Sequence, residues 1–216
     1  MPDNYLDRLP ERLRKVGAHE EGEIEILTPA PGEAGFGVLY EDKYILLLRD
    51  KVRFPEGSIG GYLRILNQSD LKGRSGSVIV PVVGDSMVFI RTFRHAIREW
   101  SWELPRGFHE EGLSEEQNAR KELQEELGGE VIEIARIGEI NANTGLLAGT
   151  IGVYRALIRE GSLPGVPEDR HESIRGWELV DESRISRFLS EKKVVCGITL
   201  AALFLYLDLN EPEKRK

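Results

Sequence analysis

An amphipathic helical pattern is the clearest periodic feature of the chain and runs from residue 114 to residue 129. Its small and apolar residues recur at four-residue steps, which is the spacing of one helix face. They are Ala119, Leu123 and Leu127. Ser114 stands at the start and fits an N-cap, whose side chain accepts a hydrogen bond from the first turn. Gly128 and Gly129 can end the helix in a left-handed conformation, so the pattern predicts one capped, amphipathic helix.

Short strand-like runs dominate the chain before residue 75, separated by turn signals rich in glycine and proline. The runs are residues 23–27, 37–40, 44–48, 51–54 and 61–66. A set of strands this small rarely has a stable core by itself. We therefore expect residues 20–75 to form an N-terminal β subdomain that packs on the rest of the chain or on a partner chain. Residues 1–19 are predicted to form an arm or a short helix.

The rest of the chain, residues 76–210, has the pattern of a larger domain that mixes strands and helices. Gly84-Asp85 separates two β-branched, apolar runs and predicts a hairpin. Further strands are expected at residues 131–137, 150–158 and 174–180, and helices at 181–189 and 195–209. The last helix is apolar almost all round, which predicts burial against the sheet. Residues 211–216 form a charged tail.

Composition narrows the class of protein. The chain has 216 residues and is 40% hydrophobic, which is enough for a real core. No apolar run reaches the roughly 18 residues that a membrane helix needs, and the N-terminus lacks the layout of a signal peptide. The single cysteine, Cys196, rules out an internal disulfide. We therefore expect a cytoplasmic protein, and the net charge of −8 argues against a general nucleic-acid binder.

Three glutamates of the predicted helix, Glu122, Glu125 and Glu126, are spaced i, i+3 and i+4 and should cluster on one side of a turn. In a chain with 37 acidic residues, such a cluster can be an ordinary solvated face. A solvated face usually alternates acids with Lys or Arg, however, whereas like charges here sit side by side. Mg²⁺ prefers a few carboxylates together with the phosphate oxygens of a substrate. The helix and the loop before it therefore have the parts of a metal–phosphate site.

The segment from Glu103 to Gly129 resembles a Nudix box, the loop–helix motif of hydrolases that cleave nucleoside diphosphates linked to another group. The family pattern is a glycine, five residues, a glutamate, seven residues, and then Arg-Glu-aliphatic-x-Glu-Glu-x-Gly-aliphatic. With the first glycine at Gly107, the remaining matches are Glu122, Leu123, Glu125, Glu126 and Gly128. The departures are Leu113, Lys121 and Gly129.

Two of these departures fall on a pair that is structural in the family. The first glutamate and the arginine generally pair with each other and stiffen the motif, and here Leu113 and Lys121 occupy their positions. The metal-binding part, Glu-x-x-Glu-Glu-x-Gly, is complete. The sequence therefore predicts a motif that has lost its stiffening pair but has kept its metal-binding glutamates.

The resemblance extends over roughly residues 35–210 and is closest to the ADP-ribose pyrophosphatase subgroup. It implies an α/β (α+β) fold: a Nudix α/β/α sandwich with a mixed sheet, plus a small N-terminal antiparallel β subdomain that builds a homodimer. It also implies Mg²⁺-dependent hydrolysis of ADP-ribose or a related nucleoside diphosphate sugar to AMP and a sugar phosphate, with Mn²⁺ as an alternative metal. Two other functions stay open. The chain could hydrolyse a different nucleoside diphosphate derivative, or it could be a non-catalytic domain that senses a nucleotide.

The resemblance also assigns roles to residues of the motif and of a later acidic loop. Glu122 and Glu126 would bind the metal, and Glu125 with the backbone carbonyl of Arg106 would complete or support the site. Gly107 would lie beside the substrate, and Glu125 is also a candidate for a catalytic role. Glu172 is the first candidate for the base that activates water. Glu168 and Asp169 are alternates, and a plain acidic surface loop is the alternative interpretation.

Two arginines are candidates for contacts with the substrate. Arg94 matches the arginine that contacts the diphosphate in the related enzymes, and a guanidinium suits phosphate because its charge and fork-like geometry are fixed. Arg53 lies in the N-terminal subdomain, which lends residues to the substrate pocket in that subgroup. Both side chains could instead be ordinary charges at strand ends or on a solvent-facing strand.

Overall fold

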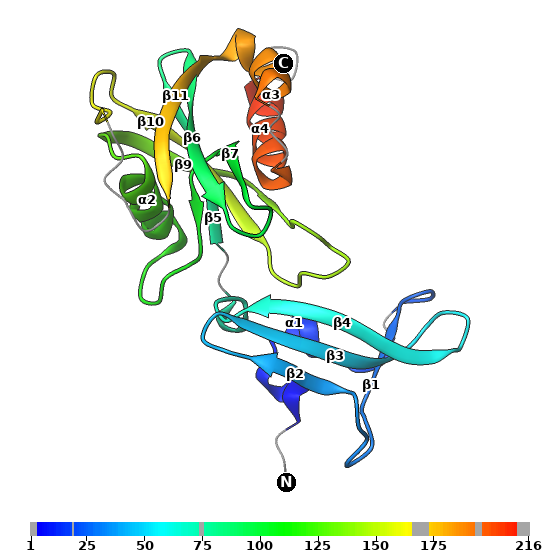
Figure 1. Ribbon diagram of the computed structural model, residues 1–216. Helices are drawn as coiled ribbons and strands as arrows, with labels where there is room; N and C mark the ends of the chain where they lie inside the picture. Colours follow the sequence, from blue (N-terminus) through cyan, green and yellow to red (C-terminus); the bar gives the residue numbers. More distant parts are fainter. Residues whose placement is uncertain (1–3, 19, 74–75, 166–172, 193–195, 211–216) are drawn as a thin grey trace. The chain divides into compact units, whose positions relative to one another are not determined.

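The computed structural model describes residues 4–18, 20–73, 76–165, 173–192 and 196–210, which form two compact units (Figure 1). The first unit takes the described residues up to 73 together with Asn143–Thr150. The second takes the remaining described residues from 76 onward. Residues 143–150 therefore belong to the first unit, although the residues before and after them in the sequence belong to the second.

The first unit is a four-stranded antiparallel sheet with a short helical arm. Its elements are η1 (Tyr5–Arg8), α1 (Glu11–Arg14), β1 (Glu25–Leu27), β2 (Gly37–Glu41), β3 (Ile45–Arg53), β4 (Ile59–Asn67) and η2 (Asp70–Lys72). Strand β3 pairs with β1 and β2 along one edge and with β4 along its whole length on the other. The prediction of two strands at 44–48 and 51–54 was wrong, because β3 continues through the polar residues between them.

Asp50 shows why β3 is unbroken. Its side chain points into the core of the unit and is only 2% exposed. Tyr5 Oη donates a hydrogen bond of 2.8 Å to Asp50 Oδ1, and Arg64 contacts both carboxylate oxygens. Arg64 Nη1 also donates to the Leu13 carbonyl at 2.9 Å. Asp50, which lies between the two predicted strands, therefore ties the N-terminal arm to the sheet.

Residues 143–150 complete the edge of the first sheet beside β4. Ile65 donates its N–H to the Leu146 carbonyl at 2.9 Å, and Ala148 returns a 3.0 Å bond to the Ile65 carbonyl. Tyr62 Oη donates to the Gly145 carbonyl at 3.1 Å. These bonds satisfy backbone groups that an open sheet edge would expose.

The second unit contains a seven-stranded mixed sheet with the central order β11-β6-β5-β10-β9. Its strands are β5 (Gly76–Val83), β6 (Ser86–Arg94), β7 (Glu99–Glu103), β8 (Arg106–Gly107), β9 (Val131–Ile140), β10 (Ile151–Ile158) and β11 (Ile174–Asp181). Strands β5 and β10 are parallel, whereas the other pairs are antiparallel. The hairpin predicted at Gly84-Asp85 is confirmed by the pairing of Val83 with Ser86.

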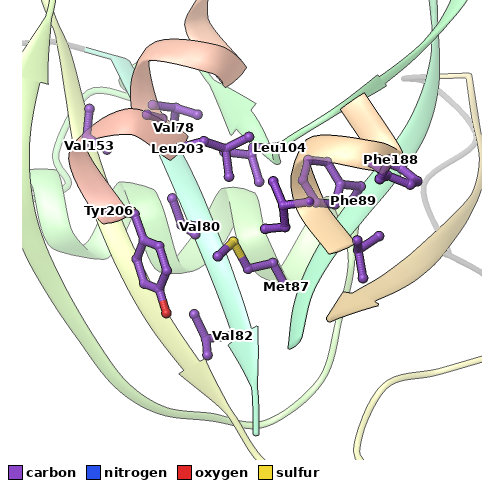
Figure 2. Close-up of a cluster of buried hydrophobic side chains, with 13 residues drawn as sticks. Val78, Val80, Val82, Met87, Phe89, Leu104, Val153, Phe188, Leu203 and Tyr206 are labelled. Carbon is purple, nitrogen blue, oxygen red and sulfur yellow. The ribbon is translucent and has the colours of Figure 1, made fainter. Parts of the chain in front are cut away.

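Helices cover both faces of this sheet, as Figure 1 shows. Helix α2 (Glu115–Glu126) lies on one face, and α3 (Ile185–Glu191), which follows η3 (Glu182–Arg184), lies with α4 (Gly197–Asn210) on the other. The core under α3 and α4, drawn in Figure 2, includes Val78, Val80, Val82, Met87, Phe89, Leu104, Val153, Phe188, Leu203 and Tyr206. The predicted α/β/α sandwich with a mixed sheet and an added antiparallel subdomain is confirmed.

Helix α4 packs on the sheet, as predicted, but only along one side. Ala202 and Leu203 are buried against the sheet, but Leu200 is 40% exposed and Phe204 is 70% exposed. The predicted burial against the sheet is therefore confirmed for one side of the helix, and the sheet leaves the opposite apolar side uncovered. Among the described residues, none of the helices combines the length and apolar character that a membrane crossing requires.

Candidate active site

Helix α2 carries the glutamates of the predicted site and has the ends that the sequence predicts. The Ser114 side chain accepts from the N–H of Gln117, whose own side chain accepts from the N–H of Ser114, so the two form a capping box. Gly128 and Gly129 follow the helix with φ values of 74° and 90°, the left-handed conformation that favours glycine. The apolar stripe of Ala119, Leu123 and Leu127 is fully buried. Local interactions therefore fix both ends of α2 and the face that it buries.

Glu122 and Glu126 stand one turn apart on the inner side of α2. Their exposed fractions are 8% and 1%. Glu126 Oε2 accepts a 2.8 Å hydrogen bond from the backbone N–H of Arg106, which fixes β8 against the helix. Gly107 lies directly beside Glu122, because a Cβ built on this glycine would approach all the atoms of the Glu122 carboxylate closer than 3.0 Å. The structure therefore brings together Glu122, Glu126, Arg106 and Gly107.

Glu125 lies apart from this group. Its side chain is 46% exposed, and its Oε2 contacts Lys121 Nζ at 2.5 Å. Residues i and i+4 of a helix differ by about 40° in direction, whereas residue i+3 falls on the other flank. The expected cluster of three carboxylates on one side of α2 therefore does not form. The roles assigned to Glu125 at the metal and in catalysis stay predictions.

The donor set of Glu122 and Glu126 fits a hard divalent cation. Both donors are carboxylates, and the lack of a side chain at Gly107 lets the Glu122 carboxylate lie against the backbone there. Within the described residues, no three side chains of His, Cys, Asp or Glu converge closely enough to hold a metal ion. Mg²⁺ commonly binds through one or two carboxylates and takes its other ligands from water and substrate phosphates. Two buried carboxylates therefore suit Mg²⁺ better than a metal that needs a complete protein cage.

A buried carboxylate, Glu103, joins the two arginines that flank the site. Its Oε2 accepts from Arg94 at 3.1 Å through Nε and 2.9 Å through Nη2, and from Arg106 Nε at 3.1 Å. Burial by itself would raise the pKa of Glu103, but the hydrogen bond from Arg94 and the charges of both arginines outweigh it and hold the pKa below its ordinary value. Arg94, expected at the substrate, is thus oriented by Glu103, and its contact with phosphate stays a prediction.

Replacing Glu103 by glutamine should lower the free energy of unfolding mainly at pH values above the pKa of the carboxyl group. The substitution removes the charge that both arginines face, which should lower the free energy of unfolding by about 2 kcal/mol. Because the pKa of Glu103 is lowered by folding, its contribution is present above the unfolded-state value of about 4.3 and is lost as the pH falls through the folded-state value. Urea unfolding of both proteins between pH 3 and pH 7 would measure this. Equal curves at pH 7 would contradict it.

The other predicted site residues lie elsewhere. Arg53 belongs to the first unit, where its Nη1 contacts Glu25 Oε2 at 2.6 Å and 47% of its side chain is exposed. This environment matches the alternative interpretation of a solvent-facing strand residue, and its role at the substrate stays a prediction. Glu172, Glu168 and Asp169 lie outside the described residues.

Comparison with known proteins decides the family. A model of the NUDIX domain matches residues 73–193, which is more than half of the chain. The chain belongs to the Nudix family. The fold is similar to the crystal structure of an ADP compounds hydrolase, with a TM-score of 0.67, 15% sequence identity, and coverage of 92% of this chain and 100% of that chain. A search of curated proteins gives no match.

An ion pair links the helix and the loop of this Nudix box, although the family's glutamate–arginine pair is absent. Lys121 Nζ contacts Glu110 Oε1 at 2.9 Å as well as Glu125 Oε2 at 2.5 Å. Partial burial would lower the pKa of Lys121, but the hydrogen bonds from Lys121 to Glu125 and Glu110 outweigh it and raise the pKa. The helix and the loop are therefore still joined by an ion pair, with Glu110 in place of a carboxylate at position 113. The family's glutamate–arginine pair is itself absent, as the sequence predicts, and Lys121 pairs with Glu110 instead.

Asn118 is a residue of the Nudix box that the sequence analysis missed. Its side chain is fully buried and bonds to the loop that follows Gly107. The available signal was a polar residue, poor at forming helix, directly before the buried Ala119 of the stripe. Such a residue inside a helix calls for a specific partner, but the sequence alone does not say which one.

Proposed function

We propose that this protein hydrolyses the diphosphate linkage of ADP-ribose or a related nucleoside diphosphate sugar, giving AMP and a sugar phosphate, with Mg²⁺ as its metal and Mn²⁺ as an alternative. The observation that carries the proposal is the buried pair Glu122 and Glu126 beside Gly107, within a Nudix box. The structural neighbour described as an ADP compounds hydrolase supports the substrate class.

The arrangement suits hydrolysis because a diphosphate is anionic and repels attacking water. Glu122 and Glu126, with the backbone carbonyl of Arg106, would hold the metal, which supplies charge neutralisation and polarisation at the phosphate. Burial of the two carboxylates strengthens their attraction for a cation. Gly107 has no side chain, so the Glu122 carboxylate can lie against the backbone at this position, and Glu125 would support the site from the outer flank.

The remaining roles fall on residues outside α2. A carboxylate of the acidic loop, Glu172 first and Glu168 or Asp169 as alternates, would take the proton of the attacking water. Arg94 would contact the diphosphate, and its bonds to Glu103 would keep the guanidinium in place. Arg53 would contribute to the substrate pocket from the N-terminal subdomain.

A panel of nucleoside diphosphate compounds tests the reaction. Each compound would be incubated with the protein and Mg²⁺, and phosphate would be measured after treatment with a phosphatase that acts only on the products. We expect ADP-ribose to give the highest kcat/KM and chelation of Mg²⁺ to abolish turnover. If another compound gives a higher kcat/KM, that compound and not ADP-ribose is the preferred substrate. Tight binding of ADP-ribose without turnover of any compound would favour the nucleotide-sensing function.

We also propose that the protein is a cytoplasmic homodimer joined through the N-terminal sheet. The face of this sheet opposite its own core exposes apolar side chains, including Tyr40 at 52%, Ile59 at 57% and Leu63 at 40%. Exposed apolar patches of this kind often mark protein–protein contacts. Size-exclusion chromatography with light scattering should give twice the chain mass of 24.4 kDa, and Leu63→Asp should give the monomer. A monomeric wild-type protein would overturn this part of the proposal.

A further inference from the structure

The side chain of Asn118 links three parts of the candidate site. Its Oδ1 accepts a 2.8 Å hydrogen bond from the backbone N–H of Glu110. Its Nδ2 donates to the Phe108 carbonyl at 3.2 Å and makes a longer contact of 3.4 Å with Ser77 Oγ. Asn118 and Ser77 are 0% and 2% exposed. One buried amide therefore holds the backbone of the loop on both sides of His109.

The position of Asn118 relates this loop to the metal-binding glutamates. Asn118 stands one turn before Glu122 on α2, so both side chains leave the same face of the helix. Ser77 is the partner of Gly107 in the pairing of β5 with β8. Asn118 thus bonds to the loop just after Gly107 and contacts the residue paired with Gly107, while Glu122 lies against Gly107 itself.

The other link between helix and loop is more exposed. The side chains of Lys121 and Glu110 are 33% and 54% exposed, and ion pairs in contact with solvent contribute little stability. Buried hydrogen bonds are costlier to lose, because removing one partner leaves a desolvated polar group. The amide of Asn118 is therefore the stronger constraint on the loop.

We propose that Asn118 is a positioning residue that fixes the loop of residues 107–110 over Glu122, in the place of the glutamate–arginine pair that this Nudix box lacks. The proposal rests on the proposed function, since it assigns Asn118 to the metal site of that reaction. It predicts that Asn118 acts through the loop backbone and has no contact with the substrate.

Asn118→Ala should weaken metal binding without removing a metal ligand. Loss of a residue that orients a metal site commonly costs 10- to 100-fold in metal affinity, so we expect the Kd for Mn²⁺, measured by calorimetry without substrate, to rise about 10-fold or more. The Mg²⁺ concentration for half-maximal hydrolysis should rise in parallel, with kcat recovering at saturating Mg²⁺. Gln124→Ala, an exposed change on the same helix, is the matched control and should leave both values unchanged.

Hydrogen exchange measures the loop directly and does not depend on activity. The amide of Glu110 should exchange faster in Asn118→Ala, whereas Asn118→Asp keeps the oxygen that accepts from this amide and should keep most of its protection. Asn118→Asp also serves if the alanine variant does not fold, since it should raise the Kd for Mn²⁺ less than loss of the whole side chain would. Unchanged exchange at Glu110 and unchanged Mn²⁺ affinity in the folded variant would overturn the proposal.

Restoring the family pair provides a rescue experiment. Adding Leu113→Glu and Lys121→Arg to Asn118→Ala should return the Mn²⁺ affinity toward the wild-type value, because the new pair would again tie the loop to the helix. If the triple variant binds Mn²⁺ as weakly as Asn118→Ala, Asn118 does not act in the place of the family pair. If wild-type protein shows no metal-dependent hydrolysis, the proposed function fails, while exchange at Glu110 still decides whether Asn118 holds the loop.

Discussion

Glu122→Gln and Glu126→Gln should each reduce Mg²⁺-dependent hydrolysis by about a thousandfold, which corresponds to several kcal/mol of lost transition-state stabilisation. The reason is chemical and not steric. A glutamine keeps the shape of the side chain but loses the charge that attracts the metal. Steady-state assays on ADP-ribose over a wide range of Mg²⁺ concentrations would measure the loss. Near wild-type turnover at saturating Mg²⁺ in either variant would show that the metal assignment is wrong.

The same variants should keep the fold. Glu126 accepts from the backbone N–H of Arg106, and the amide oxygen of a glutamine can still accept that bond. Removing one of two neighbouring buried charges also relieves repulsion in the metal-free protein. We therefore expect thermal midpoints equal to or above that of the wild type. Glu116→Gln is the matched control, because Glu116 is on the same helix, half exposed, and paired with Arg120.

Features fixed by local interactions were the ones that the sequence predicted well. The ends of α2 depend on Ser114 and on two glycines within the segment itself, and its buried stripe follows from helical spacing. The Gly84-Asp85 hairpin is equally local. The three-layer arrangement, in contrast, was expected from the resemblance to the Nudix family and not from the local pattern.

Features that depend on distant partners were missed or wrong. The predicted strands 44–48 and 51–54 left Asp50 between them, and the partners that bury it in β3, Tyr5 and Arg64, lie far away in the sequence. The segment Asn143–Thr150 carries no mark of its attachment to the first unit, since its bonds there use mostly backbone atoms. Backbone pairing of this kind leaves little trace in side-chain patterns.

The site shows the same division between spacing and partners. Helical spacing places Glu122 and Glu126 together and puts Glu125 on the other flank, but it could not show that Glu125 pairs with Lys121 there. The loss of the family pair was inferred from Leu113 and Lys121 alone, whereas the replacement carboxylate, Glu110, comes from a loop position without a regular pattern. Motif positions thus predict which residues form a site more reliably than they predict which of those residues contact one another.

Gly107→Ala should reduce hydrolysis by about a hundredfold or more, the loss expected when a catalytic group is displaced by about 1 Å. The added Cβ would lie closer than 3.0 Å to the Glu122 carboxylate. The backbone is held by the pairing of Gly107 with Ser77 and by Asn118 just beyond it, so the carboxylate, at the end of a flexible side chain, must move. Assays of kcat/KM and of Mn²⁺ affinity would measure the effect. Gly197→Ala, where a Cβ meets nothing within 4 Å, is the control.

A double-variant cycle distinguishes this overlap from a general disturbance of the loop. Glu122→Asp retracts the carboxylate by one methylene, which removes the overlap with the methyl group added at position 107 but also lengthens the reach to the metal. If both single losses arise from the same carboxylate, Gly107→Ala with Glu122→Asp should lose no more than the larger single loss, because contacting residues are not additive. Losses that multiply would mean that Gly107 acts on the site by another route. Sub-additive losses would tie the requirement for glycine at this position to the placement of the Glu122 carboxylate.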